Sequence, residues 1–159
     1  LTALGKNTIF VDCDVLQAGG GMRTACIIAA YMALKAAQQR FIAEGCISGP
    51  IITDEIASIS VGIGSNGVLL DMDFAEDSSI HADYNFVITR SEKIVEIQGI
   101  AEHTPISWND FEEIKSVALK GAKDIFDFYD KNSFDLLTTN EGKSSQSYIP
   151  SYRDMMEYT

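Results

Sequence analysis

Cysteine is scarce in this sequence, with three residues in 159, and no two of them form a CxxC pair. This spacing argues against a zinc site and against a disulfide framework. Cys13, Cys26 and Cys46 lie in or beside apolar segments. We therefore expect buried thiols in a reducing compartment, and a cytoplasmic protein.

The chain also lacks a long apolar run and a leader-like beginning. Its wholly apolar stretches are far shorter than the roughly 20 residues that span a bilayer, so we expect no membrane partner. No basic region precedes an apolar core, and Asp12 and Asp14 interrupt the first apolar segment. The first residue is Leu rather than Met, from which we expect a processed product or a fragment of a longer chain.

Basic residues are few: the sequence has 12 Lys and Arg against 23 Asp and Glu, which gives a formal net charge of −11. On charge alone this argues against a general nucleic-acid binder. No Lys or Arg occurs between residues 41 and 89. The acidic residues of that stretch are Glu44, Asp54, Glu55, Asp71, Asp73, Glu76, Asp77 and Asp83. Such a region is either a solvated acidic face or a place where a cation binds.

A length of 159 residues, 46% of them apolar, predicts one globular domain with a sizeable core. Residues 8–24 read TIFVDCDVLQAGGGMRT, which predicts a strand over 8–15, a glycine turn and a helix that begins near Met22. Glycines let backbone N–H groups approach a ligand, and a helix N-terminus carries partial positive charge. The segment therefore suits an anion such as phosphate, although a tight connection alone also explains it.

Apolar periodicity predicts the remaining elements. They are a helix over 22–44, a strand over 57–63, an Asn66-Gly67 hairpin, a returning strand over 68–74, strands over 84–89 and 94–100, and a helix from Ser107 to Lys131. The returning strand should present Leu70, Met72 and Phe74 on one face. The order β-α-β-β-β-β-α indicates an α+β fold in which helices cover a sheet. Residues 132–159 have the composition of a flexible tail.

Three segments of the sequence resemble the ribonuclease PH family of phosphate-dependent exoribonucleases. They are VDCDVLQAGGGMRTA, LLDMDFAEDSSIHADYNFVIT and IVEIQGIAE, in the family's order and with its gaps. The resemblance covers about residues 8–131 and corresponds to the family's C-terminal portion. It implies an RNase PH-like domain over 1–131, with a mixed sheet packed with helices, and the N-terminal part of the fold missing from this chain.

The resemblance also implies an activity. In the family, inorganic phosphate attacks the 3′-terminal phosphodiester of RNA and releases a nucleoside diphosphate, which requires positive charge and donors around two anions. The expectation is a phosphorolytic 3′→5′ exoribonuclease and tRNA nucleotidyltransferase that trims tRNA 3′ ends within a homo-hexameric ring. The alternatives are a catalytically inactive, exosome-like ring subunit that binds RNA or scaffolds partners, and a generic small-phosphate-binding domain.

Phosphate binding would fall to Gly21, Met22 and Arg23, where backbone N–H groups meet a guanidinium that can bind phosphate through two donors. The family usually has Thr at the position of Met22, and its hydroxyl adds a bond to phosphate. Gly19 replaces a common acidic residue, and Cys26 a small hydroxyl residue. We therefore expect weaker phosphate binding or an altered site.

By the same resemblance, Asp77 and Asp83 are the catalytic residues and the ligands of Mg²⁺ or Mn²⁺, because carboxylate oxygens suit these cations. Asp83 is also a candidate proton donor to the leaving ribose oxygen. An exposed acidic loop is the simpler alternative. His81 occupies a position where the family commonly has Asp, and is either a ligand or an exposed loop residue. Asp71 and Asp73 are either solvated or near the metal.

Overall fold

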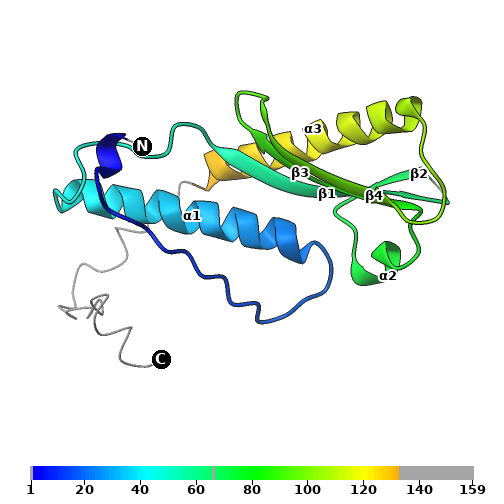
Figure 1. Cartoon of the computed structure of the whole chain (residues 1–159), viewed down its shortest axis with the longest axis horizontal. Helices are drawn as coiled ribbons and strands as arrows, with labels where there is room; N and C mark the ends of the chain where they lie inside the picture. The colour runs from blue at the N-terminus through cyan, green and yellow to red at the C-terminus, as the bar shows by residue number, and fades with distance from the viewer. Residues whose placement is uncertain (1, 66, 133–159) are drawn as a thin grey trace.

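The computed structural model describes residues 2–65 and 67–132 of the chain (Figure 1). Their elements are η1 (Thr2–Leu4), α1 (Met22–Ala43), β1 (Ile56–Gly64), β2 (Gly67–Leu70), α2 (Phe74–Asp77), β3 (Ala82–Thr89), β4 (Ile94–Ala101) and α3 (Trp108–Lys131). The helices predicted over 22–44 and from Ser107 are confirmed. The flexible tail predicted for residues 132–159 lies, beyond residue 132, outside the described residues.

The sheet has the strand order β2-β1-β3-β4, and each neighbouring pair is antiparallel. Gly64 pairs with Gly67, which confirms the predicted hairpin between β1 and β2. The α+β class is confirmed. The resemblance implies a mixed sheet, but the sheet is antiparallel throughout the described strands, and the segment over residues 8–15 does not join it.

The core forms between α3 and one face of the sheet. Alternate residues of β1 and β3 point to this face, so that Ile59 and Phe86 are buried against Ile114 of α3. Tyr31 of α1 joins the same cluster and contacts Tyr129 of α3, with ring centroids 5.5 Å apart. The polar residues that alternate with the core residues along β1 and β3 therefore lie on the opposite face of the sheet.

The start of α3 follows the sequence prediction closely. The Ser107 side chain accepts a hydrogen bond from the Asp110 N–H at 3.2 Å, and the Asp110 carboxylate accepts one from the Ser107 N–H at 2.8 Å. This capping box satisfies donors that the first turn of a helix leaves without partners.

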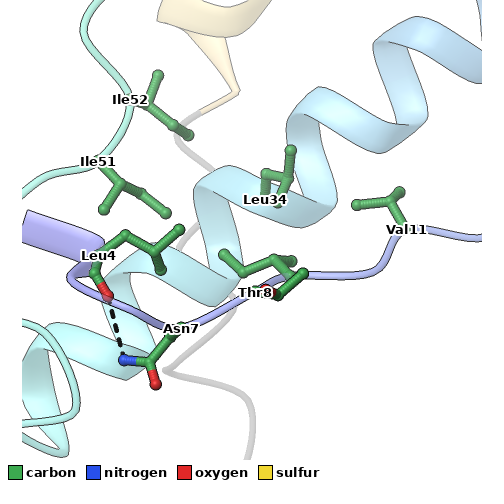
Figure 2. Close-up of a pocket in the computed structure, with 8 residues that line it drawn as sticks. Leu4, Asn7, Thr8, Val11, Leu34, Ile51 and Ile52 are labelled. Atoms are coloured by element: carbon green, nitrogen blue, oxygen red, sulfur yellow. Dashed lines mark hydrogen bonds between the residues drawn. The ribbon is translucent and has the colours of Figure 1, made fainter. Parts of the chain in front are cut away.

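The strand predicted over residues 8–15 is wrong. The segment runs extended beside α1 and forms no strand (Figure 1). Val11 instead lines an apolar groove with Leu34 of α1 and with Ile51 and Ile52 (Figure 2). A strand needs a neighbouring backbone to bond, and strand composition alone does not supply one.

The returning strand is shorter than predicted. It ends at Leu70, and Asp71 then adopts a left-handed conformation with φ of 54°, which redirects the chain. Met72 is buried as expected, whereas Phe74 begins α2 and is 72% exposed. The two-residue periodicity predicted for Leu70, Met72 and Phe74 therefore breaks at Asp71.

The thiol prediction is also wrong. Cys13 and Cys46 are exposed, and Cys26 is half-buried. Cys13 lies in the segment that forms no strand, and Cys46 lies in the turn after α1. Among the described residues, no helix combines the length and apolar character needed to cross a bilayer.

Candidate functional site

The glycine turn leads directly into α1. Gly20 and Gly21 have φ of 132° and 53°, a region that residues with a Cβ rarely adopt. Gly21 is the N-cap of the helix, no side chain caps it, and no acidic residue occupies the first turn. The first-turn N–H groups and the helix dipole are therefore left to act on an anion.

The glycine turn packs against the segment that leads into the acidic loop, although the two are far apart in the sequence. The Phe74 N–H donates to the Gly19 carbonyl at 2.8 Å. Gly20 lies so close to the same segment that an added Cβ would stand 2.4 Å from the Met72 carbonyl oxygen. The two motifs singled out in the sequence thus meet through their backbones.

The acidic residues near the glycine turn include two that cap α2 and one that lies at the turn itself. The Asp73 carboxylate caps α2 by accepting from the Glu76 N–H at 2.8 Å, and the Glu76 carboxylate accepts from the Asp73 N–H at 3.0 Å. Asp71 lies at the glycine turn: its Oδ1 atom is 3.4 Å from the position that a Cβ on Gly21 would occupy. Neither arrangement involves the pair proposed to bind a metal.

Asp77 and Asp83 lie close enough for their charges to interact. Asp77 is the exposed last residue of α2, and Asp83 is half-buried on β3, opposite Gly62. Burial raises the pKa of Asp83, and the negative charge of Asp77 raises it further. The hydrogen bond from the Asn85 amide to Asp83, at 3.2 Å, acts in the opposite direction.

A hard divalent cation fits this donor set. Two neighbouring carboxylates repel each other, and a cation between them would remove that repulsion. Mg²⁺ is commonly held by one or two carboxylates, with water and substrate phosphate completing its shell. Within residues 2–65 and 67–132, no group of three or more His, Cys, Asp or Glu side chains is arranged to hold a metal. Asp77 and Asp83 as metal ligands remain a prediction.

His81 is half-buried between α2 and β3. Its N–H donates to the Ile63 carbonyl at 2.6 Å, and its carbonyl accepts from the Glu102 N–H at 2.9 Å. Its ring stands edge-on to that of His103, with centroids 6.1 Å apart. These contacts hold the loop against the ends of β1 and β4, and a role as metal ligand stays a prediction.

Arg23 does not point to the acidic loop. Its Nη2 atom donates to Oε1 of Glu96 on β4 at 2.5 Å, and both side chains are partly exposed. Glu96 is absent from the residues predicted for the site. The sequence does carry a signal, because Glu96 is the lone acidic residue of the strand IVEIQGIA.

No family model matches the sequence. Curated relatives named ribonuclease PH do match, at 45% identity over 121 residues in Tropheryma whipplei (strain Twist) and 44% over 128 residues in Bacillus pumilus. These alignments cover 76% and 80% of this chain, but 49% and 53% of the relatives. The chain therefore spans about half the length of the curated relatives that it matches.

Solved structures agree on the fold. Rice (Oryza sativa) Rrp46 matches with a TM-score of 0.54 over 71% of this chain and 48% of that chain. A chain of the Archaeoglobus fulgidus exosome with RNA bound to the active site matches with a TM-score of 0.57 over 72% and 45%. Both are 20% identical to this chain, so they carry the fold alone. The expected RNase PH-like fold is confirmed over the matched part.

Proposed function

Because the matched region of this chain belongs to the ribonuclease PH family, we propose that it carries the phosphate and metal site of a phosphorolytic 3′→5′ exoribonuclease. The observation that carries the proposal is the contact between the glycine turn and the acidic segment, where the Phe74 N–H donates to the Gly19 carbonyl. An anion-binding helix start and a carboxylate pair then belong to one region, as a reaction between two phosphate groups requires.

Each motif has a distinct part in this proposal. The backbone N–H groups at Gly21 and Met22 and the guanidinium of Arg23 bind inorganic phosphate. Asp77 and Asp83 hold Mg²⁺ or Mn²⁺, which when bound neutralises charge on the phosphodiester. Met22 offers only its backbone N–H, and its side chain is 51% exposed. We therefore expect a lower phosphate affinity than in relatives that have Thr at this position.

The reaction transfers a nucleotide to phosphate. An oxygen of inorganic phosphate forms a bond to the phosphorus of the 3′-terminal phosphodiester, and the bond from that phosphorus to the 3′ oxygen of the preceding ribose breaks. That oxygen must gain a proton as it leaves. Asp83 is a candidate to supply it as an alternative to its role as a cation ligand, since a carboxylate that binds the cation is ionised.

The proposed substrate is the 3′ end of tRNA, and the proposed assembly is a cytoplasmic homo-hexameric ring. Two observations support a ring: the similarity to curated ribonuclease PH and the fold shared with exosome subunits. The net charge of −11 makes RNA binding by this chain alone unfavourable. Basic surface on neighbouring subunits would supply the positive charge that RNA binding requires.

The activity can be tested with ³²P-labelled orthophosphate, unlabelled tRNA that carries a 3′ extension, and Mg²⁺. We expect the label to enter nucleoside diphosphates, because the attacking phosphate becomes their terminal phosphoryl group. Omission of Mg²⁺ should stop the reaction. Release of nucleoside monophosphates without phosphate would contradict the proposal, as would an inactive protein beside an active relative that has Thr at the position of Met22.

A second candidate is an inactive ring subunit, which the Met22 replacement favours. Such a subunit would assemble and bind RNA without releasing nucleotides. Replacement of Asp77 or Asp83 by Asn would then leave RNA binding and assembly unchanged, with no cleavage in the starting protein to lose.

A further inference from the structure

Arg23 lies at an unfavourable place for a cation. It is the second residue of α1, where the partial positive charge of the helix repels a guanidinium. No acidic residue belongs to the first turn itself, although the Asp71 carboxylate lies at the glycine turn before it. In the described part of the chain, the ion-pair partner of Arg23 is Glu96, which comes from β4 at the far edge of the sheet.

This pairing holds Arg23 away from the carboxylate pair. Glu96 lies opposite Val87 in the register, whereas Asp83 lies opposite Ile100. Glu96 and Asp83 are on the same face of the sheet, because Val87 and Asp83 are an even number of residues apart. Positions 83 and 87 are four residues apart on β3, which corresponds to about 13 Å along the strand.

We propose that Glu96 is an internal competitor of phosphate for Arg23, an inference that rests on the phosphate site proposed above. Without phosphate, Glu96 supplies the negative charge that pairs with the Arg23 guanidinium. Phosphate carries more negative charge than one carboxylate, so it displaces Glu96 from the Arg23 guanidinium. The phosphate affinity of the site is then set partly by the strength of the Arg23–Glu96 pair.

The exposure of the pair fits such an exchange. The Arg23 and Glu96 side chains are 51% and 40% exposed, so water and salt screen their attraction. Ion pairs of this kind change an equilibrium constant by about two- to fivefold. A competitor of that strength raises the phosphate concentration needed for half-saturation without closing the site.

The test is phosphate binding to the full chain by titration calorimetry. Glu96→Gln removes the competing charge and should tighten phosphate binding by about two- to fivefold. Glu96→Asp keeps the charge on a shorter side chain and should give an intermediate affinity. Glu112 is an exposed residue of α3 that pairs with Lys115, so Glu112→Gln makes the same charge change elsewhere and should leave the affinity unchanged. Thermal unfolding of each variant checks that the fold is intact.

The proposal that Glu96 competes with phosphate is overturned if Glu96→Gln binds phosphate as weakly as the wild type or more weakly. It is also overturned if neither protein binds phosphate. Kinetics give a second readout: KM for phosphate should fall in Glu96→Gln while kcat stays the same. Tighter phosphate binding by Glu96→Gln without release of nucleoside diphosphate would support competition by Glu96 and reject the proposed activity. Release of nucleoside diphosphate with an unchanged phosphate affinity in Glu96→Gln would support the proposed activity and reject competition by Glu96.

Discussion

Asp83→Asn should reduce phosphorolysis by at least about a hundredfold and at the same time stabilise the fold at neutral pH. The loss follows because the neutral amide is a weaker ligand for a divalent cation than a carboxylate, and because it cannot donate a proton to the leaving oxygen. The gain follows because Asn carries no charge to bury beside Asp77. Nucleoside diphosphate release and the Tm measure the two effects, and Asp124→Asn, on an exposed part of α3, is the matched control.

The stability effect has a defined pH dependence. The pKa of Asp83 is raised in the folded state, first by burial and then by the charge of Asp77, from an ordinary value of 3.8. The folded chain therefore binds this proton more tightly than the unfolded chain does. The resulting stabilisation is fully present below pH 3.8 and is lost as pH rises through the raised pKa.

The Tm advantage of Asp83→Asn should accordingly be largest near pH 7 and disappear on acidification. An Asp83→Asn protein that keeps its activity would contradict the proposed role of this residue. One that melts below the wild type at pH 7 would contradict the electrostatic account of the acidic pair.

Gly20→Ala should separate the two halves of the site. The new Cβ would stand 2.4 Å from the Met72 carbonyl oxygen and 3.0 Å from Asp73 Cα, at a φ of 132°. Backbone atoms cannot swing aside as a flexible side chain does, so the glycine turn must move. We expect a loss of about 1–3 kcal/mol in the free energy of unfolding and a fall in activity of roughly a hundredfold.

Gly19→Ala provides the matched control for this effect. Nothing lies within 4 Å of a Cβ at Gly19, and its φ is not in the left-handed region. The alanine should therefore leave activity and the free energy of unfolding near the wild-type values. Equal behaviour of the two variants in phosphorolysis and thermal unfolding would show that contact between the turn and the acidic segment does not organise the site.

Local patterns predicted the elements whose stability is local. The helix from Ser107 begins with a capping box, and the hairpin at Gly67 follows from turn chemistry, so both could be read from neighbouring residues. The segment over 8–15 has the composition of a strand, but whether it forms one depends on a partner backbone that composition does not specify. Asp71 likewise ends β2 by a left-handed turn that the alternation of apolar residues concealed.

The candidate site divides in the same way. The glycine turn was predicted from its own residues, whereas Asp77 and Asp83 were assigned through the family resemblance, and their role as metal ligands stays a prediction. The partner of Arg23 was missed, since the approach of β4 to the start of α1 depends on tertiary packing. A lone charge in an apolar strand, such as Glu96, is a signal that a partner exists, but the sequence does not say which one.

If the glycine turn and the carboxylate pair form one site, phosphate and a divalent cation bind to it together. Binding of Mn²⁺ to the full chain, followed by electron paramagnetic resonance at increasing phosphate concentration, tests it directly. We expect phosphate to tighten Mn²⁺ binding, and Arg23→Ala and Asp83→Asn each to remove this coupling. A Mn²⁺ affinity that is the same with and without phosphate would contradict it.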